Sequence, residues 1–91
     1  MAVTFSLPTV LARLADGQST IQASGTTLGD VVAQIADRFP RLAPRLRDDQ
    51  GGPYPFVTYY LNDEDIRFRG GFSAPVSEGD EITVVAAIAG G

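Results

Sequence analysis

The sequence predicts a small α+β domain in which a mixed sheet of four to five strands carries one main helix across one face. Three observations support this fold class: the chain has 91 residues, several short segments alternate between apolar and polar residues, and one longer segment has apolar residues at helical spacing. A chain of this length suffices for one domain, so we expect residues 1–91 to form it alone. A sheet with a single helix buries both apolar surfaces by laying the helix on one face.

Two short strands are predicted in the first quarter of the chain. Residues 2–7, AVTFSL, alternate as a strand does when one of its faces packs on a core, and Pro8 ends the pattern. Residues 18–23, QSTIQA, form the second strand after a connection that holds at most one irregular helical turn and closes at Asp16-Gly17. We expect these strands to form a hairpin with a long connection.

The main helix is predicted within residues 25–40, GTTLGDVVAQIADRFP. Thr27 is suited to cap it, Asp30 lies three positions later in the first turn, and Pro40 ends it. Five apolar side chains recur at helical spacing and predict the face that packs on the sheet: Leu28, Val31, Val32, Ile35 and Phe39. Residues 41–47, RLAPRLR, add a short helical turn before a loop.

Three further strands are predicted in the second half. Residues 56–61, FVTYYL, are β-branched and aromatic, and residues 62–65, NDED, have the composition of a turn. Residues 66–71, IRFRGG, are predicted to be the partner strand. After a turn at residues 77–80, SEGD, the last strand covers residues 81–88, EITVVAAI. If this strand lies beside the first hairpin in the sheet centre, the first and last strands pair in parallel.

The composition excludes most familiar catalysis. The chain has no Cys and no His, which removes thiol nucleophiles, imidazole bases and almost every zinc or haem site. Its net charge of −4 disfavours nucleic acid and anionic membranes as partners. No apolar run reaches the length of a membrane span, and the N-terminal segment lacks the basic start of a secretory signal. We therefore expect a cytoplasmic protein that binds no metal, nucleic acid or membrane.

The last residues indicate that the reactive group is the terminal carboxylate of the main chain. They continue the apolar strand without a polar or charged side chain: Ala87, Ile88, Ala89, Gly90 and Gly91. Gly91 has no Cβ to obstruct attack on its carboxylate, and residues 86–91 in extended form reach about 20 Å, enough to enter a narrow channel in another enzyme. We predict a flexible tail over about residues 87–91, with Gly91 as the reactive group and the other four residues as partner contacts. In the alternative interpretation the glycines are incidental to an interaction module.

A second candidate contact surface contains Phe68 and Phe72, which flank Arg69 and the internal glycines. These two aromatic side chains are predicted to form an exposed apolar patch for partner docking, although core packing is the expected position of at least one of them.

The order of predicted elements and the ending GDEITVVAAIAGG resemble the ubiquitin-like β-grasp sulfur carriers of the MoaD/ThiS family, over essentially the whole chain. Within that family, the segments VTFSLPTVLARLADGQ, YYLNDEDIRFRGG and AIAGG look most like carriers of the CysO type, which serve cysteine synthesis in actinobacteria. The resemblance implies a ubiquitin-like β-grasp fold with one helix across a mixed sheet.

The resemblance also implies a mechanism and a set of partners. An E1-like adenylating enzyme would use ATP to convert the Gly91 carboxylate into an acyl-adenylate, and sulfur transfer would then give a thiocarboxylate. A PLP-dependent cysteine synthase would accept the sulfur, and a zinc metalloprotease would process the tail. The chain itself would be a protein co-substrate rather than an enzyme, with no cofactor of its own, and we expect a monomer.

Two other roles stay open within the resemblance. The small subunits of molybdopterin synthase typically carry prolines just before the tail, where this sequence has Ala86-Ala87, and this difference favours the CysO type. A ubiquitin-like protein modifier would instead form an isopeptide bond with lysines of target proteins. Related carriers donate sulfur to several products, so the final acceptor is not determined by the sequence.

Overall fold

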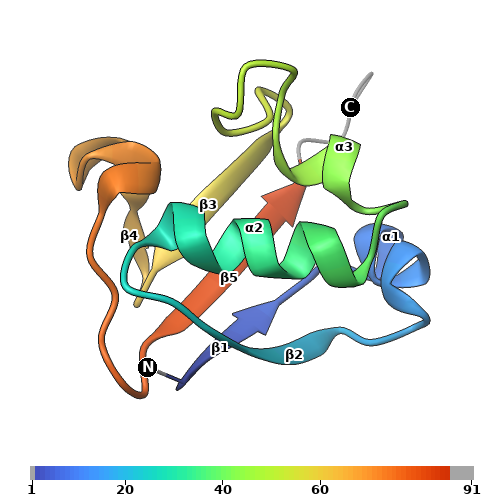
Figure 1. Ribbon diagram of the computed structural model, residues 1–91, viewed down its shortest axis with the longest axis horizontal. Helices are drawn as coiled ribbons and strands as arrows, with labels where there is room; N and C mark the ends of the chain where they lie inside the picture. Colours follow the sequence, from blue (N-terminus) through green and yellow to red (C-terminus); the bar gives the residue numbers. More distant parts are fainter. Residues whose placement is uncertain (1, 87–91) are drawn as a thin grey trace.

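The computed structural model describes residues 2–86, and these residues form two layers, a five-stranded sheet and one long helix (Figure 1). The strands are β1 (Ala2–Ser6), β2 (Thr20–Ser24), β3 (Val57–Leu61), β4 (Glu64–Asp65) and β5 (Glu81–Ala86). Their order across the sheet is β2-β1-β5-β3-β4. β1 and β5 pair in parallel and the other neighbours are antiparallel. The predicted mixed sheet is confirmed, with the last strand at its centre beside the first.

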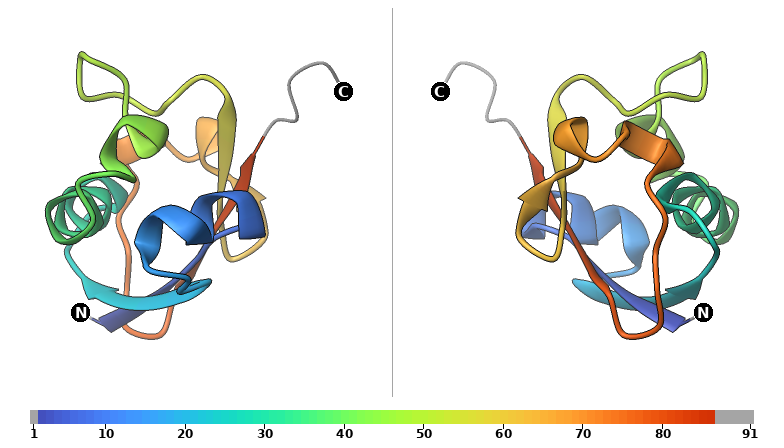
Figure 2. Two further views of the ribbon diagram at one scale, coloured as in Figure 1. Left: turned by 90° about the vertical axis from the view of Figure 1, so that its right-hand side faces the viewer. Right: turned by 90° about the vertical axis from the view of Figure 1, so that its left-hand side faces the viewer.

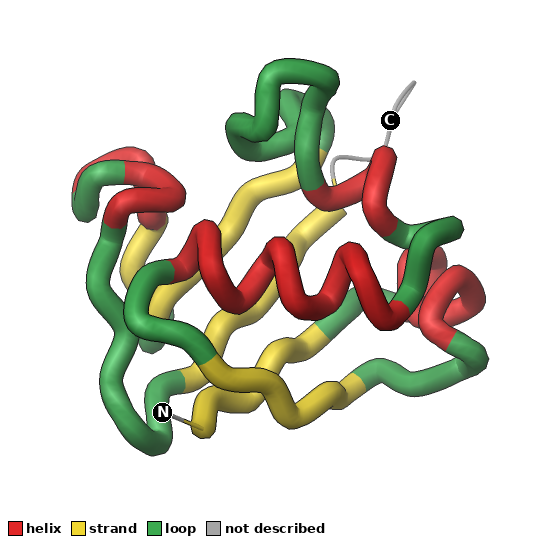
Figure 3. The backbone as a smooth tube through the Cα atoms, in the orientation of Figure 1, coloured by secondary structure: helices red, strands yellow, loops and turns green. Residues whose placement is uncertain are grey.

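The helix α2 (Leu28–Arg38) lies across one face of the sheet (Figures 1 and 3). Its start has the predicted cap: the Thr27 hydroxyl accepts the backbone N–H of Asp30 at 3.2 Å, and the Asp30 carboxylate accepts the backbone N–H of Thr27 at 3.3 Å. This reciprocal pair satisfies two N–H groups that the helix itself cannot. Figure 2 shows both layers from the side, with α2 seen along its axis.

The core lies between α2 and the sheet. Alternate residues of the central strands point into it, among them Val3 and Phe5 of β1 and Ile82 and Val84 of β5, as the period-two pattern predicts. All five side chains of the predicted helical stripe are buried. Tyr59 of β3 is buried as well, and its hydroxyl donates a hydrogen bond of 2.6 Å to the Leu46 carbonyl.

Short helices connect the main elements. They are α1 (Thr9–Ala12), α3 (Ala43–Leu46) and three 3₁₀ helices, η1 (Arg13–Ala15), η2 (Ile66–Phe68) and η3 (Gly71–Ser73). Figure 1 shows α1 and α3 at the side of the sheet where β5 ends, whereas η2 and η3 lie beside the beginning of α2, on the opposite side. The short helical segments predicted after Pro8 and at residues 41–47 correspond to α1 with η1 and to α3.

The prediction of a strand over residues 66–71 is wrong. The partner strand of β3 is the two-residue β4, and the chain then enters η2 because the Asp65 carboxylate accepts the backbone N–H of Arg67 at 2.9 Å and caps a helical turn. Gly70 and Gly71 have φ angles of 98° and 63°, so the chain turns again instead of extending. The predicted turn at residues 62–65 is likewise shorter, since Glu64 and Asp65 belong to the strand.

The described residues contain neither a membrane-spanning helix nor a metal-binding cluster. None of the helices within residues 2–86 is long and apolar enough to cross a membrane. Across the same part of the chain, no group of three or more acidic side chains is arranged to hold a metal ion.

Candidate functional site

The end of β5 is the point at which the described chain reaches the predicted tail. Ala86 pairs with Val57 of β3, whereas β1 pairs only with the first half of β5, up to Thr83. β1 ends at Ser6 and Pro8 turns the chain into α1, so the second half of β5 has a strand neighbour on one side only. The predicted reactive Gly91 and the contacts Ala87, Ile88, Ala89 and Gly90 lie outside the described residues.

A groove of about 660 Å³ occupies the space on the open side of β5. We call it the tail-side groove. It is lined by Val10, Leu11, Arg13, Leu14, Arg41, Arg45, Tyr54, Phe56, Val57 and Ala86. The lining residues come from α1 and η1, from the segment that contains α3, from the loop before β3 and the start of that strand, and from the end of β5. The groove therefore exists because a helix, rather than a strand, follows β1.

The tail-side groove combines apolar side chains with positive charge. Val10 and Phe56 are each 57% exposed, although large apolar side chains in the described chain are mostly buried. Arg13, Arg41 and Arg45 are exposed, and no carboxylate is among the lining residues. Within residues 2–86, none of the three arginines forms an ion pair. The groove thus presents a positive, partly apolar surface on a chain whose net charge is −4.

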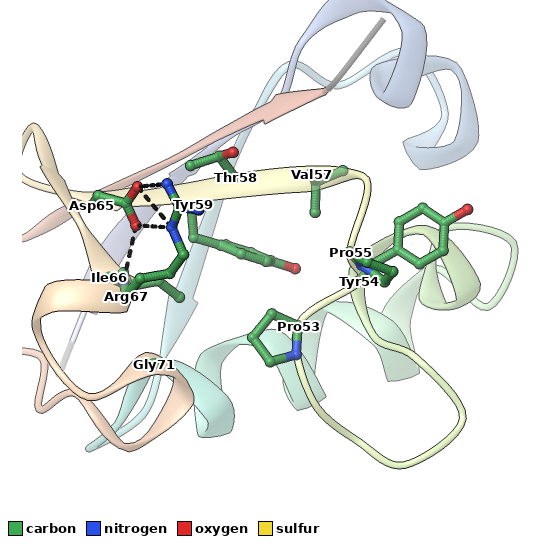
Figure 4. A pocket seen from close by; sticks show the side chains of 10 residues that line it. All are labelled: Pro53, Tyr54, Pro55, Val57, Thr58, Tyr59, Asp65, Ile66, Arg67 and Gly71. Carbon is green, nitrogen blue, oxygen red and sulfur yellow. Dashed lines mark hydrogen bonds and ion pairs between the residues drawn. The ribbon is translucent and has the colours of Figure 1, made fainter. Parts of the chain in front are cut away.

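A smaller cavity of about 270 Å³ lies along β3 (Figure 4). The Tyr59 side chain extends from β3 toward Pro53, and Arg67 and Asp65 form an ion pair of 2.6 Å at the edge (Figure 4). Hydrogen bonds from Arg67 lower the pKa of the Asp65 carboxyl, and burial raises the pKa of the Tyr59 hydroxyl. Tyr59 therefore stays protonated and bonded to the Leu46 carbonyl, so neither group is available as a general base.

The structure separates the two phenylalanines predicted to dock partners. Phe68 in η2 is 80% exposed, whereas Phe72 in η3 is half-buried and packs its ring against Tyr59 with centroids 5.3 Å apart. The expectation that at least one of them packs against the core is met by Phe72. The 3₁₀ helices η2 and η3, which carry these residues, lie beside the beginning of α2, away from the end of β5 (Figure 1). A docking role for either residue remains a prediction.

Sequence reasoning did not identify the tail-side groove. Arg41 and Arg45 are four residues apart, in the segment that contains α3, but Arg13 lies almost thirty residues earlier. Nothing in the local sequence indicates that Arg13 and Phe56 line the same groove. Only the parallel pairing of β1 with β5 brings the segment after β1 next to the end of β5.

The fold and the end of β5 together define a class of protein. A five-stranded mixed sheet with one long helix across it, and a central last strand that leads toward a Gly-Gly sequence, is a ubiquitin-like β-grasp domain. The model of the ThiS family matches residues 6–91, and the chain belongs to this family.

Individual relatives agree with this assignment. The chain is 41% identical to the sulfur carrier protein CysO of Mycobacterium tuberculosis over 93 residues, which cover 100% of both chains. It is similar to the crystal structure of Mycobacterium tuberculosis CysO, with a TM-score of 0.86, 39% identity and coverage of 94% of this chain and 99% of the other.

A chain in the crystal structure of the Amycolatopsis orientalis BexX/CysO complex is similar at a TM-score of 0.89 and 36% identity, covering 98% and 99% of the two chains. The small archaeal modifier protein SAMP1 of Haloferax volcanii, at 23% identity, a TM-score of 0.85 and full coverage of both chains, shows the same fold. The expected fold and the resemblance to the CysO type are confirmed.

Proposed function

We propose that this chain is a sulfur carrier protein of the CysO type. It carries sulfur as a thiocarboxylate on Gly91 and donates it in biosynthesis, most directly of cysteine. The observation that supports this role is the match to CysO, which covers 100% of both chains at 41% identity, so that the tail of this chain corresponds to the end of a sulfur carrier.

The proposed chemistry takes place on the Gly91 carboxylate. A carboxylate oxygen attacks the α-phosphorus of ATP in an E1-like adenylating enzyme, pyrophosphate leaves, and the product is an acyl-adenylate. A sulfur nucleophile then displaces AMP, leaving a thiocarboxylate. The first step makes the carboxyl carbon of Gly91 a good electrophile instead of a poor one. The second step gives a thiocarboxylate, whose sulfur is a strong nucleophile. The side chains of this chain take no part in either step, which agrees with a sequence that has no Cys and no His.

The domain contributes recognition and presentation. A PLP-dependent synthase accepts the sulfur and a zinc metalloprotease processes the tail, so cofactors and ATP belong to the partners. The complex of BexX with CysO from Amycolatopsis orientalis supports the idea that carriers of this type dock on other proteins. We place these reactions in the cytoplasm, where ATP is available to the adenylating enzyme, and we propose that the carrier is a monomer between encounters.

The test is the intact mass of the protein after incubation with ATP, its cognate adenylating enzyme and a sulfide source. We expect a mass gain equal to the replacement of one oxygen by sulfur, located in the C-terminal peptide. The matched control is the variant that lacks Gly91, which should fold as the wild type does and show no gain. A wild-type protein that keeps its mass in the presence of an active cognate enzyme contradicts the proposal.

The same reaction, repeated with cell extract or with the candidate sulfur acceptors added, separates the alternative roles. Conjugates of higher mass with target proteins, dependent on Gly91 and formed in place of a thiocarboxylate, would indicate a protein modifier. Thiocarboxylate that is consumed by a molybdopterin precursor, and not by a cysteine synthase, would move the acceptor away from the CysO type while leaving the carrier role intact.

A further inference from the structure

We propose that the tail-side groove is the docking surface for a partner protein that presents acidic side chains around an apolar projection, at the entrance of the site that receives residues 87–91. This inference rests on the proposed function, because it assigns a surface of the domain to the partner that the tail must reach. It concerns the groove residues of the described chain, which the tail chemistry does not use.

The position of the groove puts it within reach of a partner that binds the tail. Ala86 lines the groove and is also the residue to which the tail is attached. Five extended residues span at most about 18 Å, so a partner that binds Gly91 has its surface within that distance of Ala86. A protein that close to the end of β5 contacts the elements around it, and on the open side of β5 these elements form the groove.

The charges of the groove favour an acidic partner. Its three arginines face no carboxylate in the lining, whereas three arginines elsewhere in the described chain have partners. Arg67 pairs with Asp65 and Arg69 with Glu64. Arg38 donates a hydrogen bond of 2.8 Å to the Gln22 carbonyl.

Acidic side chains gather instead at the other end of β5. There Asp80 accepts a hydrogen bond from Asn62, and Glu78 accepts one from the backbone N–H of Ala2. Asp48 follows α3 and is not at that end, and its carboxylate accepts the N–H groups of Gln50 and Gly52 within its own loop. The groove lining and the opposite end of β5 therefore differ in sign, and an acidic entrance attracts the groove and repels the opposite end.

The apolar part of the groove provides the centre of the contact. Val10 and Phe56 are more than half exposed, and the Phe56 ring stacks edge-on against Tyr54 with centroids 5.4 Å apart. Aromatic and Arg side chains are the types enriched in protein interfaces, and apolar residues surrounded by charges form the usual core and rim. Because the apolar surface here is concave, the matching partner surface is an apolar projection.

The other possible occupants fit less well. A second copy that docked through the same surface would bring the same three arginines against these three, with no carboxylate to offset them. The tail of this chain has no acidic side chain, so its single terminal carboxylate would face three positive charges. A partner surface with several acidic groups is the occupant that balances the charge.

The test compares two double variants that each lose two positive charges, R41Q/R45Q in the groove and R38Q/R47Q, whose side chains are not among the groove-lining residues. Binding of each full-length protein to the cognate adenylating enzyme is measured by fluorescence anisotropy without ATP, beside ATP-dependent thiocarboxylate formation. We expect R41Q/R45Q to raise the Kd about tenfold at low salt, with a smaller difference at high salt, because charge attraction is screened. R38Q/R47Q should stay within about twofold of the wild type, because neither side chain lines the groove. Thermal unfolding confirms that both variants are folded.

Each outcome is decisive. Equal Kd values for the two double variants overturn the groove as a docking surface, and Gly91 activation in the same samples shows that the proposed function survives. Binding that depends on Arg41 and Arg45 without activation of Gly91 supports the groove and contradicts the proposed function. A wild-type protein that does not bind the enzyme overturns the docking proposal.

Two measurements on the protein without its partner test whether the groove instead holds the tail of its own chain or a second copy of the protein. If amidation of the Gly91 carboxylate shifts the amide resonances of groove residues, the groove holds the tail of its own chain and the docking proposal is overturned. A concentration-dependent dimer that R41Q/R45Q abolishes would assign the groove to a second copy and overturn it as well. Unchanged groove resonances and a monomeric wild type support the proposal.

Discussion

Phe68 and Phe72 lie four residues apart in the sequence and in opposite environments. Phe68 is 80% exposed, while the Phe72 ring contacts the buried Tyr59 and its backbone lies over the first turn of α2. An aromatic side chain that remains exposed contributes little to folding, whereas one packed on the core contributes through the area it removes from water. Substitutions at these two positions can therefore distinguish a loss of partner docking from a loss of stability.

We expect Phe72→Ala to lower the free energy of unfolding by about 2 kcal/mol, less than the loss for a fully buried Phe because the side chain is only half-buried. Phe68→Ala should change it by less than about 0.5 kcal/mol. Urea denaturation measures both. If Phe68 is a partner contact, Phe68→Ala weakens binding to the adenylating enzyme without loss of stability. A Phe68→Ala protein as unstable as Phe72→Ala would show that the exposed position is wrong.

Gly29 illustrates a residue whose role needs the tertiary structure. Glycine within the first turn of a helix costs about 1 kcal/mol relative to alanine, and the sequence alone offers no compensation. In the structure, a Cβ atom at this position would lie 3.1 Å from the Phe72 carbonyl oxygen and 3.3 Å from its Cβ. The absence of a side chain therefore allows η3 to approach α2, a contact between segments more than forty residues apart.

At the level of elements, the cap at the start of α2 makes the stability of the protein depend on pH through Asp30. The Asp30 carboxylate accepts hydrogen bonds from the Thr26 hydroxyl, at 2.7 Å, and from the backbone N–H of Thr26 and Thr27. These bonds, with that of the Thr26 hydroxyl the largest cause, lower the pKa of Asp30. A carboxyl whose pKa is lower in the folded protein stabilises the fold above its unfolded pKa. This contribution is lost as the pH falls through the folded pKa, that is, below about pH 4.

We therefore expect Asp30→Asn to flatten the dependence of stability on pH below about pH 4 and to lower stability at neutral pH. Thr27→Ala should cost about 1 kcal/mol at neutral pH, because it removes the hydroxyl that caps the helix, and should keep most of the wild-type pH dependence, because the Thr26 hydroxyl, the largest cause of the lowered Asp30 pKa, remains. Urea unfolding at a series of pH values from acidic to neutral compares the two variants with the wild type. An Asp30→Asn protein whose stability follows the wild-type pH curve would show that the cap does not depend on the charge of Asp30.

The elements that could be predicted are those defined by local pattern. The alternation in β1 and β5, the capped stripe of α2 and the β-branched run of β3 are each readable within a few residues, and each is confirmed. The prediction for residues 66–71 is wrong because a side-chain cap from Asp65 and two glycines with positive φ outweigh the strand preference of Ile66 and Phe68. A cap formed by one carboxylate is a three-dimensional detail that residue type alone does not determine.

At the level of the whole molecule, the hydrophobic core of the described chain is built from residues between positions 3 and 84. The buried apolar side chains of the described chain all lie in that range, and nearly all of them belong to one cluster. The sequence predicts Gly91 as the reactive group and residues 87–90 as partner contacts, whereas it does not predict the tail-side groove at the end of β5. The groove is composed of four segments that only the complete topology brings together, so no local pattern could have indicated it.

We expect a chain that lacks residues 87–91 to unfold within about 0.5 kcal/mol of the full-length protein, because changes outside the core have small effects on stability. Thermal and urea unfolding of both proteins measure the difference. A much larger loss would mean that these residues contribute to the folded domain, and the interpretation of the segment as a free tail would then be wrong.

The parallel pairing of β1 with β5 has a consequence for biosynthesis. β5 is the last of the five strands to be translated, yet it separates the β2-β1 pair from the β3-β4 pair and bonds to both. Until β5 leaves the ribosome, neither pair has its central neighbour, and the contact between Thr4 and Glu81 waits for almost the entire chain. Completion of the sheet and appearance of residues 87–91 therefore fall at the same moment of synthesis. Under the proposed function, the adenylating enzyme would therefore meet this segment attached to a finished domain.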